Sequence, residues 1–304
     1  MIGDLADAHV IAVLRELGDL GVHSPLVLDS PALQAQGFSL TLDQLHHAGI
    51  SIELDDPFGT GWLRRYAPSG WGTGTIAGSL EAVSRRAFLA LVGAITRLGN
   101  RRWLTPLDAM LKAEDRLVQL DVARALGIRV PQTIVTSDPD AAEAMLGRQF
   151  VVKPISGGYF WTASGARTVF TSLLEAHEAQ GLDFAAAPFI AQQWIDVSTH
   201  LRVVTVGSKA WVCELEAKGR PIDWRQQEEA HFSWRATEDP ELGQRAVGLA
   251  RELGAGYSSQ DWVRDDEGSA FLDLNPGGQW LFMPNPPARS ITRAIASFLA
   301  GGAA

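Results

Sequence analysis

Two adjoining segments near the end of the chain, residues 258–265 and 269–276, constrain its fold most strongly, because together they predict a β-hairpin. They read SSQDWVRD and SAFLDLNP, and the Asp-Glu-Gly between them fits a three-residue turn that ends in a left-handed glycine. The register that this turn implies pairs Asp265 with Ser269, Val263 with Phe271, and Asp261 with Asp273. The hairpin therefore places two aspartates directly opposite each other.

The opposed aspartates predict a metal site. Directly opposed side chains have Cβ atoms ~4.5–5.5 Å apart, and two like charges at that distance destabilise a sheet. A Mg²⁺ ion removes the conflict, because it prefers one or two carboxylates together with phosphate oxygens and water. Asn275 lies two residues beyond Asp273 and therefore on the same face. The alternative is that one aspartate lies beyond the hairpin and points into solvent.

Other strands are predicted upstream of this hairpin. Residues 201–216 predict a second hairpin, whose two-residue turn Gly207-Ser208 has glycine first, as a type II′ turn requires. Residues 150–153 and 189–195 are short apolar runs that predict buried strands. Strands connected by hairpins form antiparallel sheets.

Helices are predicted between and around these strands. Residues 105–127 predict one long helix, with Thr105 as its N-cap and Asp108 as the second member of a capping box. Residues 239–254 predict an amphipathic helix that ends at a glycine. The combination predicts an α+β domain with antiparallel sheets, preceded by an N-terminal α/β unit.

Composition and charge restrict the functions that are compatible with this fold. The net charge of −9 over 304 residues argues against a nucleic-acid partner. No apolar stretch approaches the ~20 residues that cross a bilayer, and the acidic first residues are not a secretory signal. Cys213 is the single cysteine, which excludes an internal disulfide and fits a reducing cytoplasm. We therefore expect a cytoplasmic protein without a membrane partner.

Two positive side chains have surroundings that suit phosphate. Lys153 ends a predicted strand, and the Pro-Ile-Ser-Gly-Gly that follows supplies flexible backbone amides. Arg202 shares a strand face with Val204 and Val206, where an arginine is seldom buried without an anionic partner. A nucleoside triphosphate would explain both features. The alternatives are a surface loop after Lys153 and an internal salt bridge for Arg202; we interpret the glycine-rich residues 70–78 as a plain loop.

In their order along the chain, these motifs resemble those of the ATP-grasp superfamily. The matching segments are FVVKPISGG (150–158), FIAQQWI (189–195), LRVVTVG (201–207), DWR (223–225), QDWV (260–263) and FLDLNPGGQW (271–280). DWR and NPGGQW are most similar to ribosomal-peptide maturases of the microviridin, or graspetide, type. The likeness begins near residue 7 and includes AEDRLVQLDVARALGIRVPQT (113–133). It implies an ATP-grasp fold with a pre-ATP-grasp α/β domain at 1–104 and two ATP-grasp subdomains at 105–191 and 192–304.

The resemblance also implies a role for each matching residue. Asp261, Asp273 and Asn275 would hold Mg²⁺ ions that bridge the phosphates of ATP. The residues that would bind the nucleotide are Arg116, Lys153, Ser156, Gly157, Gly158, Gln192, Gln193, Trp194, Ile195 and His200. Among these, 192–195 would form the hinge over adenine. Lys153 would also act in catalysis, Arg202 would neutralise the transferred γ-phosphoryl group, and Arg225 would hold a substrate carboxylate or an acyl phosphate.

Two of these residues depart from the pattern of the superfamily. Arg116 stands where a lysine is usual, so a point donor becomes a planar fork. His200 stands where an acidic residue commonly binds the ribose hydroxyls, and a neutral imidazole accepts one such bond. Both changes keep the ability to bind a nucleotide but alter its contacts.

The implied reaction is ATP-dependent joining of an Asp or Glu side chain of a precursor peptide to a Thr or Ser hydroxyl or a Lys amine. The implied partners are the leader and core of that peptide, and a second copy of the chain in a homodimer. Residues 156–165 predict a lid that excludes water from the acyl phosphate. His231 is either a base for the second step or a structural residue, and we interpret Cys213 as part of the core.

Two other functions remain open at this point. The first is a ligase that joins free amino acids or other small molecules through the same nucleotide site. The second is a nucleotide-binding scaffold without turnover, although all the residues that carry the chemistry are present. A peptide maturase needs an exposed groove for its substrate, whereas a small-molecule ligase needs a closed pocket.

Overall fold

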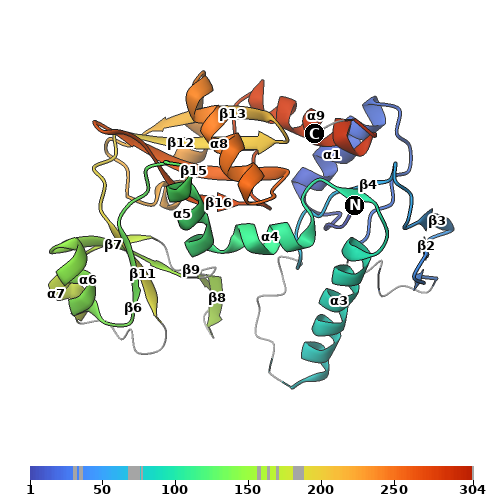
Figure 1. The fold of residues 1–304 in the computed structure, drawn as a ribbon, viewed down its shortest axis with the longest axis horizontal. Coiled ribbons are helices and arrows are strands. Elements are labelled where there is room, and N and C mark those ends of the chain that lie inside the picture. The colour runs from blue at the N-terminus through green and yellow to red at the C-terminus, as the bar shows by residue number, and fades with distance from the viewer. Residues whose placement is uncertain are drawn as a thin grey trace.

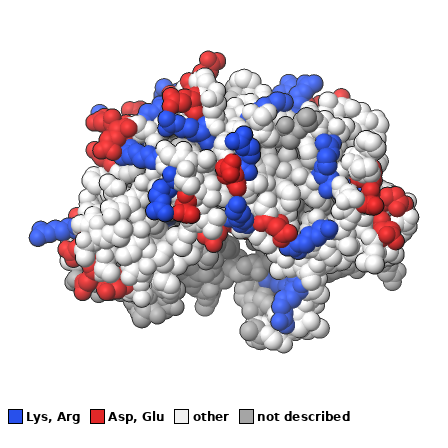
Figure 2. Space-filling model, in the orientation of Figure 1, with Lys and Arg blue, Asp and Glu red and all other residues white. Residues whose placement is uncertain are grey.

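The computed structural model describes residues 1–29, 33, 37–67, 76, 78–155, 159–162, 165–168, 171–180 and 188–302. These residues form an α+β fold, as predicted, in which a four-stranded and a five-stranded antiparallel sheet hold most of the chain after residue 132 (Figure 1). Among all the described residues, no helix is both long and apolar enough to cross a membrane. On the face that Figure 2 shows, acidic and basic side chains are interspersed.

The larger sheet has the strand order β14-β13-β12-β15-β16. Its strands are β12 (Thr199–Val206), β13 (Lys209–Glu216), β14 (Arg235–Thr237), β15 (Tyr257–Asp265) and β16 (Gly268–Asn275). The hairpin predicted over 201–216 is confirmed: Val206 pairs with Lys209 across the turn, and Gly207 has a φ of +56°. Two short 3₁₀ helices, η2 (Trp224–Gln226) and η3 (Glu228–Phe232), connect β13 to β14.

Helices cover both faces of this sheet. They are α8 (Pro240–Glu252) on one face, and α1 (Ala8–Asp19) and α9 (Pro287–Leu299) on the other. The alternation of side chains along β12 explains the two layers, because Val203 packs with Leu249 of α8, whereas Val204 packs in the core that contains Val13 and Ile295. The predicted helix at 239–254 is therefore confirmed, with Asp239 as its cap.

The smaller sheet has the order β10-β7-β11-β6 and carries two helices. Its elements are β6 (Thr133–Thr136), α6 (Pro139–Leu146), β7 (Gln149–Pro154), β10 (Ser172–Glu175), α7 (Ala176–Gln180) and β11 (Phe189–Gln193). Between β7 and β10 the chain forms a separate two-stranded hairpin, β8 (Tyr159–Thr162) and β9 (Gly165–Thr168). Both strands predicted from apolar runs thus lie next to each other, with Ile190 of β11 paired to Lys153 of β7.

The described residues of the N-terminal part form short strands and the helices α1 and α3 (Leu80–Arg97). Its elements are α1, the three-stranded sheet of β1 (Ser39–Leu40), β2 (Gln44–His47) and β3 (Ile50–Glu53), the strand β4 (Thr60–Gly61), the helix α3 and β5 (Arg102–Trp103). Strands β4 and β5 pair in parallel. Ile2 forms parallel bridges with both Leu28 and Leu63, so the first residues tie this part together.

The prediction of one helix over 105–127 is wrong. The chain forms α4 (Leu107–Glu114) and α5 (Arg116–Ala125), separated by Asp115, whose carboxylate caps α5 by accepting from the backbone N–H groups of residues 117 and 118. Thr105 does not cap α4, because its hydroxyl instead accepts from the backbone N–H of Tyr257. Asp108 pairs with Arg97 of α3 rather than with a helix terminus.

The hairpin predicted over 258–276 is confirmed, but its turn is not. Asp265 pairs with Gly268, so the turn has two residues instead of three. The additional residue is Leu272, which forms a β-bulge between the pairs Trp262–Phe271 and Asp261–Asp273. Because the bulge compensates for the shorter turn, the predicted opposition of Asp261 and Asp273 is confirmed.

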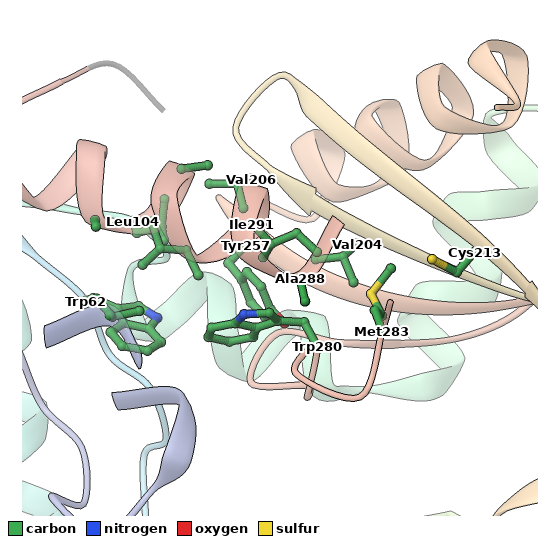
Figure 3. Close-up of a cluster of buried hydrophobic side chains, with 14 of the residues drawn as sticks. Trp62, Leu104, Val204, Val206, Cys213, Tyr257, Trp280, Met283, Ala288 and Ile291 are labelled. Atoms are coloured by element: carbon green, nitrogen blue, oxygen red, sulfur yellow. The ribbon is translucent and has the colours of Figure 1, made fainter. Parts of the chain in front are cut away.

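A core of large aromatic side chains joins the N-terminal part to the larger sheet (Figure 3). Trp62, Tyr257 and Trp280 are fully buried, with ring centroids of Trp280 6.1 Å from Trp62 and 5.4 Å from Tyr257. Cys213 lies in the same cluster near Met283, and burial raises the pKa of its thiol to about 12. Cys213 is therefore a core residue, as expected, and not a nucleophile.

Candidate active site

A cleft between the two sheets adjoins a second cavity at the opposed aspartates. The cleft contains most of the predicted nucleotide residues, namely Arg116, Lys153, Gln192, Gln193, Trp194, Ile195 and His200. The second cavity, of about 540 Å³, contains Asn275, Arg202, His231 and Phe282. Four residues line both, Trp224, Arg225, Asp261 and Asp273. The structure thus brings together predicted residues that are up to 159 positions apart in the sequence, from Arg116 to Asn275.

The aspartate pair lies at the junction of the two spaces. Each carboxylate has an arginine partner: Arg202 Nη2 lies 3.1 Å from Asp261 Oδ1, and Arg116 Nε lies 3.2 Å from Asp273 Oδ1. Burial, and to a smaller extent the charge of Asp273, raise the pKa of Asp261 in spite of Arg202. A carboxylate destabilised in this way is a suitable ligand for a cation, so the pair fits the predicted Mg²⁺.

Asn275 reaches the same cavity one pleat further along β16, where it pairs with Ser259. Its Oδ1 accepts from the backbone N–H of Gly277 at 2.9 Å, which fixes the orientation of the side chain. Among the described residues, no three His, Cys, Asp or Glu side chains gather as a metal site of their own. The predicted ligand set of two carboxylates and one amide suits an ion that takes its other ligands from phosphate and water.

Lys153 and Arg116 stand at the end of β7. Burial lowers the pKa of Lys153 to about 8, and the charge of Asp273 opposes this effect. Arg116 Nη1 donates to the carbonyl of Pro154 at 2.7 Å, so its fork links β7 to the aspartate pair. The planar guanidinium makes these two contacts through different nitrogen atoms, whereas a lysine would have a single nitrogen for both. Ser156, Gly157 and Gly158 lie outside the described residues, and so do the parts of the predicted lid on either side of β8 at 156–158 and 163–164.

The predicted hinge lines the cleft unevenly. Gln192 is buried, and its Nε2 donates to Thr133 Oγ1 at 2.9 Å, so its side chain is held against β6. Trp194 is 41% exposed at the rim, whereas Ile195 packs with Val263 in a small apolar cluster. The hinge therefore offers backbone and apolar surface to a base, while the amide of Gln192 is used within the protein.

His200 lies on β12 inside the cleft. Burial, reinforced by the nearby charge of Arg220, lowers its pKa to about 4. The imidazole is therefore neutral at pH 7, in the state that the predicted contact with ribose requires.

The two predicted catalytic arginines are held in different ways. Arg202 Nη1 donates to Ser259 Oγ at 2.8 Å, and its guanidinium lies 5.3 Å from the ring centroid of Phe282. Arg225 forms a bidentate pair with Asp223, at 2.7 Å and 2.6 Å. Burial favours a neutral Asp223, but the hydrogen bonds from Arg225 outweigh it and hold the pKa of that carboxyl below its usual value. Two donors of Arg225 are thus occupied, and Asp223 orients the remainder.

Sequence reasoning missed a clamp that holds the loop after Asn275. Asp7 Oδ1 lies 2.9 Å from His9 Nδ1, and Asp7 Oδ2 lies 3.2 Å from Arg64 Nε. Burial lowers the pKa of His9, and the neutral ring accepts at Nε2 from the backbone N–H of Trp280. Arg64 donates to the carbonyl of Gly277. No local pattern marks the contacts of His9 and Arg64 with the loop, because their partners there are more than 200 positions away in the sequence.

Comparisons with known proteins agree with this arrangement. No protein-family model matches the chain. A RiPP-associated ATP-grasp ligase from Chryseobacterium gregarium, solved with ADP and with leader and core peptide, superposes with a TM-score of 0.84 over 100% of this chain and 96% of its own, at 20% identity. The ATP-grasp ligase PsnB, solved with a minimal precursor, Mg and ADP, gives a TM-score of 0.75 over 98% and 96%, also at 20% identity.

The curated relatives match only part of the chain. A probable alpha-L-glutamate ligase from Xanthomonas euvesicatoria pv. vesicatoria is 29% identical over 178 residues, which are 56% of this chain and 59% of the relative. The chain thus spans about three fifths of the length of the curated relatives that it matches. Over its full length, however, it has the fold of the ATP-grasp ligases, and the resemblance inferred from its motifs is confirmed.

Proposed function

We propose that this chain is an ATP-dependent ligase that joins an Asp or Glu side chain of a ribosomal precursor peptide to a Thr or Ser hydroxyl or a Lys amine. The observation that carries the proposal is the junction of the two spaces at Asp261 and Asp273. A nucleotide in the cleft would direct its phosphates to this junction, and a carboxylate substrate would reach the same point from the second cavity.

The side chains at the junction suit phosphoryl transfer to a carboxylate. Lys153, Arg202 and Arg225 supply positive charge where the γ-phosphoryl group and the carboxylate would meet. The acyl phosphate and ADP form first; the hydroxyl or amine then attacks the acyl carbon, phosphate leaves, and the nucleophile loses its proton. Mg²⁺, held by Asp261, Asp273 and Asn275, would offset the charge of the phosphates during the first step.

The choice of a peptide as substrate is supported by two observations. The second cavity is partly open, and its lining continues past residues 65–67 into a third cavity of about 610 Å³. This space exceeds what a free amino acid needs. In addition, a structural neighbour over the whole chain was solved with a leader and a core peptide. The homodimer and the domain boundaries stay predictions.

A second candidate function is ligation of a free amino acid to a carboxylate. The observation that favours it is the sequence similarity to a probable alpha-L-glutamate ligase. The nucleotide site would be the same, and the two candidate functions differ only in which substrate occupies the second cavity.

Intact-protein mass spectrometry separates the two functions. A precursor peptide, sought among short reading frames rich in Thr, Asp and Glu beside the gene, is incubated with the enzyme, ATP and Mg²⁺. We expect successive losses of water from the peptide, and we expect Asp273→Ala to abolish them. Asp121→Ala serves as the control, because Asp121 is exposed on α5, where its ion pair among the described residues is with Arg124. An unchanged peptide mass together with ADP formation from free amino acids would favour the second candidate and refute the first.

A further inference from the structure

Among the described residues, three arginines that line the second cavity have buried N–H groups that make no well-aligned hydrogen bond. The groups are Nη2 and Nε of Arg64, Nε of Arg65 and Nε of Arg202. The Nε atoms of Arg64 and Arg65 lie 3.2 Å and 3.8 Å from Asp7 Oδ2, but neither makes a hydrogen bond to it. Buried donors on charged groups are almost always paired in folded proteins, so their number in one cavity points to an anionic ligand.

The three arginines differ in how far they are committed to the protein. Arg202 already contacts Ser259 and Asp261, and its remaining donor belongs to the phosphate end of the cavity. Arg64 is almost fully buried and holds the carbonyl of Gly277. The side chain of Arg65 is 38% exposed, and the 3.8 Å approach to Asp7 is its nearest ion pair. Of the three, Arg65 therefore has the side chain that is most accessible to a ligand.

Arg65 also stands where two cavities meet. It lines both the second cavity, of about 540 Å³, and the third cavity, of about 610 Å³, together with Tyr66, Ala67 and Gln279. Arg202, Asp261 and Asp273 line only the first of these, so Arg65 lies on the side that leads away from the phosphate end. A group bound by Arg65 would belong to a part of the substrate that does not react.

We propose that Arg65, with Arg64 behind it, binds a second carboxylate of the substrate, distinct from the one that is phosphorylated. A single carboxylate suits the site better than a phosphate, because Asp4, Asp7 and Asp29 of the third cavity and Glu114 of the second cavity offset most of the positive charge of Arg64 and Arg65. The planar fork of arginine also matches a carboxylate. This inference rests on the proposed function: the preferred substrate carries a further acidic side chain close to the reacting one.

A cycle of enzyme and substrate variants tests the subsite. Each Asp and Glu of the precursor core is replaced in turn by Asn or Gln, and each peptide is titrated by calorimetry into the wild type, Arg65→Gln, Arg65→Lys and Arg124→Gln. Arg124 is exposed on α5 outside both cavities and serves as the control. Calorimetry reports binding without turnover, and ADP release is measured in parallel.

One acidic residue of the peptide is expected to stand out. Its replacement should weaken binding to the wild type and to Arg124→Gln about 10-fold or more, as loss of a charged hydrogen bond implies, while ring formation elsewhere continues. Arg65→Gln should remove this discrimination, and Arg65→Lys should restore part of it. A merely structural role would instead weaken all peptides by the same factor, and that result would overturn the proposal.

Failure of the subsite and failure of the proposed function give different results. If the wild type modifies the peptide but no acidic residue couples to Arg65, the subsite is wrong and the ligase function stands. If the peptide is not modified, the same cycle is run with free L-glutamate against L-glutamine as probes. Equal binding of these two amino acids by the wild type and by Arg65→Gln would then refute the subsite as well.

Discussion

Gly278 stands at a close approach between the loop after β16 and strand β15, and replacing it by alanine tests how that loop is positioned. The new methyl group would lie 2.4 Å from Ser259 Cβ and 3.3 Å from Asn275 Cβ. Carbon atoms in contact normally lie ~3.5–4 Å apart, so either the loop or Ser259 must move by about 1 Å. Ser259 cannot move freely, because its hydroxyl accepts from Arg202 and donates to the carbonyl of Gln279.

The expected effect of Gly278→Ala follows from this geometry. Overpacking of a rigid site costs about 1–3 kcal/mol, and we expect the free energy of unfolding in urea to fall by that amount. We also expect ADP formation to fall about 10-fold or more, because Arg202 and Asn275 are both displaced. Gly248→Ala is the matched control. Its methyl group would meet nothing within 4 Å on helix α8, so it should stabilise the protein by about 0.5–1 kcal/mol and leave activity unchanged.

Two results would contradict this reasoning. If Gly278→Ala unfolds at the same urea concentration as the wild type, the contact with Ser259 is not close in solution. If stability falls but ADP formation does not, the loop and Ser259 do not position the catalytic side chains.

Three further predictions concern other side chains. Arg64→Met should lower the free energy of unfolding at pH 7 by about 3 kcal/mol, because it removes the nearest positive charge from Asp7 and the donor to the carbonyl of Gly277; an unchanged urea midpoint would refute the clamp. Since the pKa of His200 falls from its ordinary 6.5 to about 4 in the folded protein, the stability that its neutral form provides is fully present above pH 6.5 and is lost as the pH falls toward 4. Urea unfolding at pH 7 and pH 4.5 should therefore show about 2–3 kcal/mol more loss for the wild type than for His200→Gln, and equal losses would exclude the burial of a neutral imidazole. Asp115→Ala should cost about 1 kcal/mol by removing the cap of α5, whereas a thermal melt unchanged from that of the wild type would show that the cap is not needed.

Short-range patterns were sufficient to predict much of this fold. Alternating polarity and a glycine-first turn predicted the hairpin of β12 and β13, and an apolar spacing of three and four predicted α8. The opposition of Asp261 and Asp273 was also predicted, although by a register that the structure corrects. A turn shorter by one residue and a bulge of one residue cancel, and the sequence does not distinguish the two arrangements.

Contacts between distant segments could not be predicted. Beside the break between α4 and α5, the buried Gln119 donates to the carbonyl of Ala113 at 2.6 Å and exchanges hydrogen bonds with the backbone of Leu274 at 2.7 Å and 2.8 Å. Thr105 has a good capping sequence, but a backbone N–H of β15 competes for its hydroxyl. The role of Arg64 likewise appears only when the loop at 277 lies beside it. Local propensity gives way at each of these places to a partner that the linear sequence does not identify.

The bulge at Leu272 divides the hairpin of β15 and β16 into two halves whose registers are set independently. On the side of the site, Gln119 holds Leu274 and fixes the aspartates. On the side of the hairpin tip, Arg129 donates two hydrogen bonds to the carboxylate of Asp265, of 2.7 Å and 2.8 Å. Residues added to or removed from the tip would be absorbed there and would leave the aspartates opposed. The tip is accordingly the place where related chains can diverge in length, and where a label or an affinity loop could be inserted, without changing the chemistry of the site.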